Sequence, residues 1–149
     1  MENETKHILL VEDDEAHAEI IMRELDSCKD NYKIKHLDNG SDALNYILNR
    51  EQYAKKDMHP TPALIILDLK LPEINGIEIL KNIKDDPELR KIPVIILSSS
   101  KDDADIDAAY ENHANSYLIK PADAQAFNQI LKLLINYWLN WNTFSTVNY

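Results

Sequence analysis

Five residues whose side chains can do chemistry stand directly after short apolar stretches of the chain. Glu12 and Asp13 follow the first stretch, Asp68 the third, Ser98 the fourth and Lys120 the fifth. If the stretches are parallel strands, their carboxyl ends meet at one edge of a sheet, where open parallel sheets bind their ligands. A solvated loop could supply any one of these residues by chance, but all five in register with strand ends are hard to explain in that way. The sequence therefore predicts a polar site at this edge.

The three carboxylates of this predicted site favour a bound cation. Two carboxylates about 4 Å apart repel each other by about 4 kcal/mol at an effective dielectric constant near 20. A hard divalent cation removes that repulsion, and Mg²⁺ suits a site that also holds water and a phosphate oxygen. A carboxylate nucleophile, a cation site, a mobile lysine charge and a donating hydroxyl are the parts that capture of a phosphoryl group requires. We therefore interpret the site as a phosphoryl acceptor with Asp68 as its nucleophile.

The apolar stretches supply the strands that would position these residues. Three of them are unbroken and rich in Leu and β-branched residues, as is typical of strands covered on both faces. The second stretch mixes polar with apolar residues and the fifth is short, so both suit the edges of a sheet. The stretches are Ile8–Val11, Tyr32–Leu37, Ala63–Leu67, Val94–Leu97 and Tyr117–Ile119.

Helical periods fill the intervals between the strands. Apolar residues recur there at spacings of three and four. This period is weakest over Asp103–Asn112, and the last helical segment runs from Ala122 to about Asn142. This alternation predicts an α/β fold, a doubly wound five-stranded parallel sheet with helices on both faces. No Gly/Ser-rich linker divides the chain. We therefore expect one domain over residues 1–142, with an extended C-terminal helix, and a tail over residues 143–149.

Composition excludes several classes of function. A formal charge of −10 repels phosphate backbones and no basic stripe is present, so we expect no nucleic-acid partner. The longest apolar runs have four or five residues, far short of a membrane span. The single cysteine, Cys28, suits a reducing compartment, and we expect a cytoplasmic protein. Neither glycine belongs to a phosphate-cradling motif, which argues against a dinucleotide enzyme or a P-loop NTPase.

Four segments give the chain a resemblance to a known family: ILLVEDD, LIILDLKLPEING, IPVIILSSS and SYLIKP. Over about residues 6–135 it resembles the receiver domain of two-component response regulators, the CheY-like family. The resemblance implies the strand order 2-1-3-4-5 and a Mg²⁺ or Mn²⁺ cofactor. Asp13 and Asp68 would bind the cation directly and Glu12 would act through water. The backbone carbonyl of Lys70 would complete the protein's ligands.

The same resemblance implies a role for each remaining site residue. Asp68 would be the phosphoacceptor, Lys120 the lysine of the family motif, and Ser98 a replacement for the more frequent threonine. On phosphorylation Ser98 would move toward the phosphoryl group and Tyr117 would rotate inward, which would bias the fourth helix. The Lys120–Pro121 bond would be cis. Such a domain catalyses its own phosphotransfer and dephosphorylation, and it is a signalling domain rather than an enzyme acting on other substrates.

Two further segments indicate a subfamily and partners. The polar stretch Arg50–Pro62 is longer than a minimal connection, and the C-terminus is rich in aromatic residues. Together they make the chain similar to single-domain response regulators associated with phytochrome-type sensor kinases. A sensor histidine kinase is the expected phosphoryl donor. The aromatic C-terminus would either cap the domain's own core or form a homodimer or kinase contact, the dimer using this segment or the face of strand five and the last helix. Its aromatic residues are Tyr137, Trp138, Trp141 and Phe144.

Three alternatives remain open at this stage. Lys70, two residues after the acceptor, either changes the lifetime of the acyl phosphate or points to solvent; an unchanged dephosphorylation rate in Lys70→Ala would rule out the first. The chain could be a receiver fold that signals without phosphorylation. It could also be a phosphatase of the haloacid dehalogenase type, although that family wants an acid at position 70. The histidines show no metal-ligand spacing, and we interpret them as surface or strand-edge residues.

Overall fold

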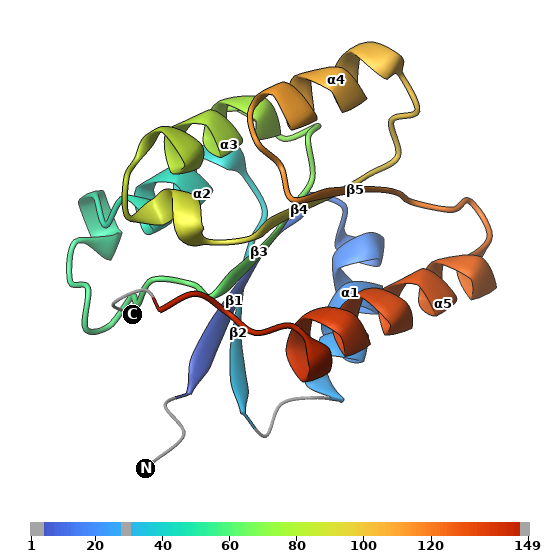
Figure 1. The fold of residues 1–149 in the computed structure, drawn as a ribbon, viewed down its shortest axis with the longest axis horizontal. Helices are drawn as coiled ribbons and strands as arrows, with labels where there is room; N and C mark the ends of the chain where they lie inside the picture. Colours follow the sequence, from blue (N-terminus) through green and yellow to red (C-terminus); the bar gives the residue numbers. More distant parts are fainter. Residues whose placement is uncertain (1–4, 28–30, 147–149) are drawn as a thin grey trace.

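The computed structural model describes residues 5–27 and 31–146, and within them five parallel strands form one sheet. The spatial order is β2-β1-β3-β4-β5, which confirms the predicted fold class and strand order. Every neighbouring pair is parallel, so all carboxyl ends lie at the same edge (Figure 1). The strands are β1 (Lys6–Val11), β2 (Tyr32–Leu37), β3 (Leu64–Leu67), β4 (Val94–Ser98) and β5 (Ser116–Ile119).

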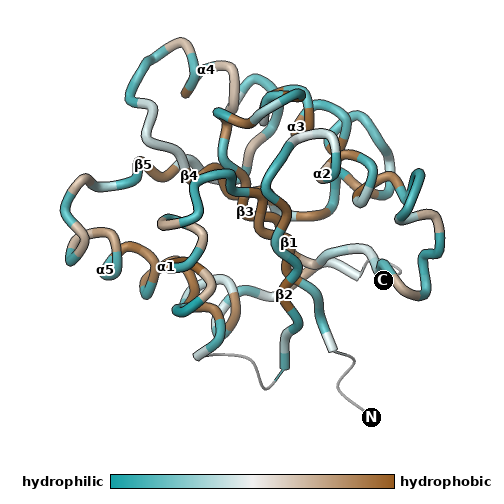
Figure 2. Tube along the Cα trace, turned by 180° about the vertical axis from the view of Figure 1, so that it is seen from behind, coloured by the Kyte–Doolittle hydropathy of each residue, from teal (hydrophilic) through white to brown (hydrophobic). Residues whose placement is uncertain are grey.

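Helices cover both faces of the sheet because the central strands carry apolar side chains on both faces, and these must be buried. Side chains alternate across a strand: Leu9 and Val11 join a core cluster under α2, α3 and α4, whereas Ile8 and Leu10 join a second cluster under α1 and α5. The apolar strands lie at the centre and the polar loops lie outside (Figure 2). The helices are α1 (Glu15–Asp26), α2 (Gly40–Ile47), α3 (Gly76–Asp85), α4 (Asp103–Glu111) and α5 (Ala124–Ile135), with short turns η1 (Glu51–Tyr53) and η2 (Leu89–Lys91).

Four of these helices begin at a side-chain cap. The carboxylate or amide oxygen of the residue before the helix accepts a hydrogen bond from the backbone N–H three residues later, and this satisfies one of the unpaired donors of the first turn. Asp14 caps α1 in this way. The other caps are Asn39, Asn75 and Asp123.

The fourth helix agrees with the expected pattern, whereas the last helix differs from it. In α4 only Ala109 is buried, in agreement with the weak apolar period predicted there. The last helix is not a single α-helix up to Asn142, because α5 ends at Ile135 and continues as a π-helical segment, η3 (Asn136–Trp141). Sequence periodicity cannot detect this widening, which depends on how the segment packs against the sheet.

The π-helical segment is tied to the first two strands. The hydroxyl of Tyr32 in β2 donates to the carbonyl of Leu139 at 2.8 Å, and the Lys6 amine lies 4.9 Å from the centre of the Phe144 ring. Trp138 and Phe144 pack on the core cluster of α1 and α5, whereas Tyr137 and Trp141 are exposed. Trp138 and Phe144 therefore cap the domain's own core, whereas a dimer or kinase contact through Tyr137 and Trp141 stays a prediction. The tail prediction for residues 147–149 lies outside the described residues.

Both glycines stand where two backbone segments approach closely. Neither has a positive φ, so the need for glycine is one of space and not of backbone conformation. A Cβ on Gly40 would lie 1.8 Å from the carbonyl oxygen of Ile74, and one on Gly76 would lie 2.4 Å from the carbonyl oxygen of Asp68. The loop that follows the acceptor is therefore packed directly against the first turns of α2 and α3.

At the opposite edge of the sheet a single lysine joins three segments. The Lys84 amine, near the end of α3, donates to the carbonyls of Arg90 and Ile92 and to the side-chain oxygen of Asn115 at 2.8–3.1 Å. The same Asn115 oxygen accepts from the backbone N–H of Val94. Burial lowers the pKa of Lys84 to about 8, because all three acceptors are neutral.

Within the described parts of the chain, no helix combines the length and apolar composition that a bilayer span would need. The polar stretch before β3 packs through Tyr53, which is buried against the rings of Tyr46 and His59. It lies beside α2, away from the carboxyl edge of the sheet (Figure 1).

Candidate functional site

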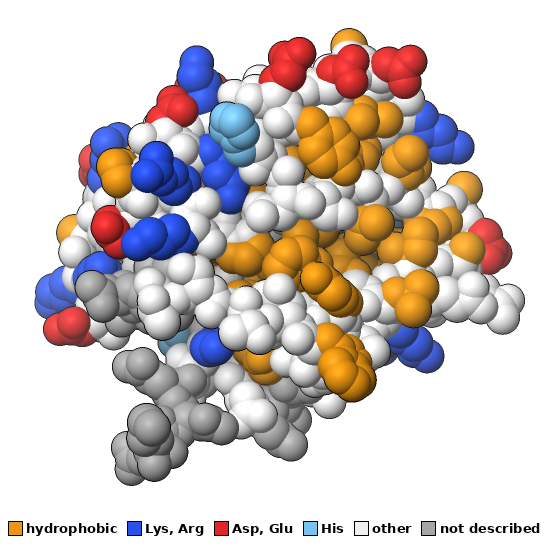
Figure 3. Space-filling model, in the orientation of Figure 1, with side chains coloured by type: hydrophobic (Ala, Val, Ile, Leu, Met, Phe, Trp, Pro, Cys, Tyr) orange, Lys and Arg blue, Asp and Glu red, His pale blue; other side chains and the backbone are white. Residues whose placement is uncertain are grey.

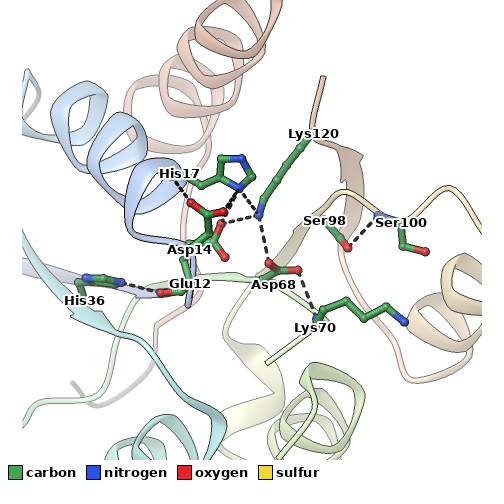
Figure 4. Close-up of polar contacts among 9 residues, drawn as sticks. All are labelled: Glu12, Asp14, His17, His36, Asp68, Lys70, Ser98, Ser100 and Lys120. Atoms are coloured by element: carbon green, nitrogen blue, oxygen red, sulfur yellow. Dashed lines mark hydrogen bonds and ion pairs between the residues drawn. The ribbon is translucent and has the colours of Figure 1, made fainter. Parts of the chain in front are cut away.

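The carboxyl ends of β1, β3 and β5 bring charged residues together, as Figure 4 shows. One oxygen from each of Glu12, Asp13 and Asp68 lies within 4.8 Å of the others. Glu12 and Asp68 are buried, whereas Asp13 is exposed. Strand register produces this convergence, because Val11 pairs with Leu67 and the next residues therefore leave the sheet side by side. The predicted acidic cluster is thus present in the fold.

Lys120 inserts its amine between two of these carboxylates. The side chain is 4% exposed, and its amine donates to Asp68 Oδ2 at 3.1 Å and to Glu12 Oε1. Burial alone would lower the pKa of Lys120, but the hydrogen bonds and charges of Glu12 and Asp68 outweigh it and raise this pKa. The amine is therefore a fixed positive charge at the acceptor carboxylate.

Glu12 has one oxygen without a partner. Its Oε2 is buried and makes no hydrogen bond within the described structure, although a buried polar atom normally has a partner. Burial and the nearby Asp68 raise the pKa of Glu12 to about 8, and Lys120 acts in the opposite direction. An orphaned carboxylate oxygen beside two further carboxylates fits a hard divalent cation, which prefers oxygen ligands. The site residues therefore fit the implied Mg²⁺ or Mn²⁺.

The raised pKa of Glu12 predicts how stability changes with pH. A carboxyl group that ionises at about 8 in the fold and at 4.5 when unfolded stabilises the fold fully below pH 4.5, and this contribution is lost as the pH rises through 8. In chelator-treated protein we expect the free energy of unfolding to fall over this range by on the order of 3 kcal/mol. Urea unfolding at several pH values measures it. Glu12→Gln should flatten the dependence; an equally steep curve in that variant would assign it to another group.

Ser98 lies on the other side of the acceptor and is completely buried. Its hydroxyl oxygen accepts from the backbone N–H of Ser100 at 3.2 Å, and the Tyr117 hydroxyl donates to the carbonyl of Ser100 at 2.9 Å. The predicted switch residues therefore meet at one backbone segment. An open cavity of about 200 Å³ at the site is lined by Asp68 and Lys120, and by Ser99 in place of Ser98.

The two ends of Lys70 have different contacts. Its backbone N–H donates to Asp68 Oδ1 at 3.3 Å, whereas its amine lies 3.3 Å from Asp105 Oδ2 on α4. Figure 4 shows the side chain extending away from the acidic cluster. Asp105 also accepts from the Ser100 hydroxyl, and these contacts lower the pKa of Asp105. The Lys70 side chain is 69% exposed, in agreement with the solvent alternative, and its effect on the lifetime of the acyl phosphate stays a prediction.

The Lys120–Pro121 prediction was wrong. No peptide bond in the described residues is cis. The trans isomer is intrinsically favoured in X–Pro bonds by about 0.5–1 kcal/mol, and with this bond trans the Lys120 amine still reaches both carboxylates. Insertion of the lysine therefore does not require the cis form that the family resemblance implied.

His17 belongs to the site, although the sequence placed it among surface histidines. Its Nδ1 lies 3.1 Å from the Lys120 amine and 3.4 Å from Glu12 Oε1. Its backbone N–H donates to the capping residue Asp14. The N-cap offered a signal, because the third residue after a cap lies on the first helical turn, next to the end of the preceding strand.

With the fold and site established, comparison with known proteins identifies the class. Residues 8–132 match the response regulator receiver domain. The chain belongs to the response regulator receiver family.

Several relatives resemble most of the chain. It is 41% identical over 135 residues to the probable methanogenesis regulatory protein FilR2 of Methanothrix harundinacea, covering 91% of this chain and 84% of FilR2. It is 34% identical over 137 residues to response regulator Rcp1 of Synechocystis, covering 92% and 91%. The Mn²⁺-bound structure of Rcp1 superimposes with a TM-score of 0.89, 33% identity and coverage of 95% and 99%. The phosphorylated cyanobacterial phytochrome response regulator RcpA also gives 0.89, with 35% identity and the same coverage.

Proposed function

We propose that this chain accepts a phosphoryl group on Asp68 from a sensor histidine kinase and thereby switches a protein-interaction face. The observation that carries the proposal is the buried Lys120 amine, which joins Asp68 to Glu12 at a cluster with one unpartnered carboxylate oxygen. Glu12, Asp13, Asp68 and the Lys70 carbonyl would hold Mg²⁺ or Mn²⁺. The cation would neutralise charge on the incoming phosphoryl group.

The transfer is balanced without a further reactant. An Asp68 oxygen attacks phosphorus as the bond from phosphorus to the donor's histidine nitrogen breaks. That nitrogen keeps the electron pair, and the proton on the other ring nitrogen makes the leaving group a neutral imidazole. Lys120 stabilises the negative charge on the phosphoryl oxygens, as a cation already placed beside the acceptor costs no reorganisation. The buried Ser98 hydroxyl turns toward a phosphoryl oxygen. Family membership and the phosphorylated relative RcpA support this chemistry.

The switch is proposed to run from Ser98 to α4. When Ser98 turns, it releases the N–H of Ser100, whose carbonyl holds the Tyr117 hydroxyl. Tyr117 then moves inward, and α4, with Ala109 as its single buried residue, shifts at low cost. Elements with few buried apolar contacts open most readily.

Treatment with acetyl phosphate and Mg²⁺ tests the acceptor directly. We expect a mass increase of one phosphoryl group on the wild-type chain, none with chelator and none in Asp68→Asn. Intact-mass spectrometry measures the modification, and Lys70→Ala and Asp105→Asn report how the ion pair between these residues affects its lifetime. An unmodified wild-type chain would favour a receiver fold that signals without phosphorylation, and sustained turnover of phosphate esters would favour a phosphatase.

A phytochrome-type kinase is the proposed donor. Rcp1 and RcpA support this assignment, RcpA being described as a phytochrome response regulator. FilR2 is described as a methanogenesis regulator, so similarity of this degree does not by itself select one kinase class. Phosphotransfer to this chain should be faster from a phytochrome-type kinase than from an unrelated histidine kinase, and the reverse order would contradict the assignment. We place this relay in the cytoplasm, on the single-cysteine composition of the chain.

The proposed interaction face runs along α5 and η3. Leu133, Tyr137 and Trp141 stand four residues apart and are 71%, 55% and 76% exposed. Figure 3 shows hydrophobic side chains gathered over β5 and α5, and a groove of about 250 Å³ lies between Leu118 in β5 and this helix. Tyr and Trp are enriched at interfaces. A second copy of this chain is the proposed occupant, because an apolar stripe can pair with the same stripe of another copy about a two-fold axis.

Charge placed on this stripe should separate the two copies. Tyr137→Lys and Trp141→Lys each remove apolar burial worth about 1.5–3 kcal/mol, so the dimer dissociation constant should rise at least tenfold. Light scattering after size exclusion measures the mass. Met58→Lys, at an equally exposed residue away from the stripe, is the matched control and should leave the mass unchanged. A wild-type monomer at high concentration in both phosphorylation states would contradict the dimer.

A further inference from the structure

His17 has no part in the proposed transfer, yet its ring contacts the catalytic lysine. The imidazole of His17 is about one-third exposed, and it is held on two sides. Its backbone N–H bonds to the Asp14 cap, and its ring meets the ring of Phe127 in α5 edge-on, with centroids 5.7 Å apart. The position of the ring is therefore set by the first turn of α1 and by the helix packed against it.

The chemistry of lysine decides which group donates in the contact between His17 and Lys120. A lysine ammonium has three donors and no acceptor, so Nδ1 of His17 is the acceptor in this 3.1 Å contact. The remaining two donors face Glu12 Oε1 and Asp68 Oδ2. The ammonium thus has three acceptor atoms within hydrogen-bond distance, one for each of its donors.

The three acceptors differ in what else they are needed for. Glu12 and Asp68 are the carboxylates that the proposed cation and phosphoryl group also use, whereas His17 is not. From these contacts we infer that His17 is a positioning residue for Lys120: its Nδ1 holds the ammonium toward the acceptor when the carboxylate oxygens are engaged elsewhere. This inference rests on the proposed function, and it adds a residue from α1 to the machinery on the strand ends.

Two substitutions of His17, to asparagine and to leucine, distinguish the effect of the hydrogen-bond acceptor from the effect of the side chain's shape. Asn Oδ1 stands the same number of bonds from the backbone as His Nδ1 and can accept, whereas leucine has a similar shape and no acceptor. His113→Asn is the control, since His113 is exposed and lies near the start of β5, at the opposite edge of the sheet. Thermal unfolding of all variants detects a purely structural effect.

The first measurement needs neither metal nor phosphoryl donor. In nitrogen-detected spectra of lysine ammonium groups, assigned with Lys120→Met, the Lys120 protons of metal-free wild type should exchange slowly with water. His17→Leu should accelerate that exchange about tenfold, and His17→Asn should stay near wild type. The second measurement is the rate of Asp68 modification by acetyl phosphate, which should fall about tenfold in His17→Leu, equivalent to about 1.4 kcal/mol, and recover in His17→Asn.

Each result of these measurements either supports or contradicts the positioning role of His17. Equal behaviour of His17→Leu and wild type in both measurements overturns it, as does an Asn variant no better than the Leu variant, which would assign the effect to ring packing on Phe127. If the wild-type chain is not modified at all, the proposed function fails, while the ammonium exchange still shows whether His17 orients Lys120.

Discussion

Replacing Lys120 by methionine is expected to destabilise the metal-free protein by about 3–5 kcal/mol and to slow phosphorylation of Asp68 about a hundredfold. The methionine side chain has nearly the same length but no charge. It leaves Glu12 and Asp68 buried without their shared cation, and Glu12 with both oxygens unpaired instead of one. Removing one partner of a buried ion pair is costly because the other charge remains buried.

Mg²⁺ distinguishes this effect from a simple loss of packing. Because the carboxylates of Lys120→Met lack a counterion, Mg²⁺ should stabilise the variant more than the wild type in urea unfolding. Lys84→Met is the matched control, since it removes a half-buried lysine amine whose acceptors, unlike those of Lys120, are all neutral. It should leave both the Mg²⁺ effect and the phosphorylation rate as in wild type. A metal-free Lys120→Met protein as stable as wild type would show that the ion pair is not a net source of stability.

Replacing Gly76 by alanine is expected to destabilise the fold by about 3 kcal/mol and to impair the acceptor as well. Helix propensity alone predicts the opposite sign, since alanine is favoured over glycine in a helix by about 1 kcal/mol. The added Cβ would lie 2.4 Å from the carbonyl oxygen of Asp68 and 2.7 Å from Cα of Leu69. Both contacts are with backbone atoms, which cannot turn aside as a flexible side chain can. The steric term should therefore outweigh the propensity term.

Because the Cβ added in Gly76→Ala clashes with the backbone of Asp68, the phosphorylation rate tests this prediction in addition to stability. Relief of the contact must move the backbone of Asp68 itself, so the phosphorylation rate should fall more than tenfold even under conditions where the variant is folded. Gly40→Ala also introduces a clash, but with Ile74 at the far end of the same loop, and it should lower stability with a smaller effect on the rate. Urea unfolding and acetyl phosphate labelling measure the two quantities. A stable and fully reactive Gly76→Ala protein would contradict the close approach.

The sequence predicted those parts of the fold that depend on local pattern. β1, β3 and β4 are buried on both faces, so their unbroken apolar runs identified them, and the residues after Val11 and Leu67 were placed at one edge because parallel strands end together. The contacts that were missed come from tertiary packing. His17 reaches Lys120 across 103 residues of chain, and no spacing within the sequence reports such a contact.

Two other differences have the same origin. The amine of Lys70 lies on Asp105 because α4 happens to begin within its reach, and the position of α4 relative to the loop after β3 is not a property of either segment. The last helix widens at Asn136 where it is tied to Tyr32 and packed on the first two strands. In both cases the residue types were visible, but the geometry that gives them partners was set by the assembled sheet.

The three hydrogen bonds of the Lys84 amine hold one end of α4 more firmly than the other. They fix Asn115, just beyond the carboxyl end of α4, to the end of α3 and to the approach to β4. The amino end of α4 is attached through Asp105, by its contacts with Ser100 and with the exposed Lys70, and an exposed ion pair contributes little to stability. We therefore expect that the proposed movement of Ser100 displaces the first turn of α4 more than the Asn115 end.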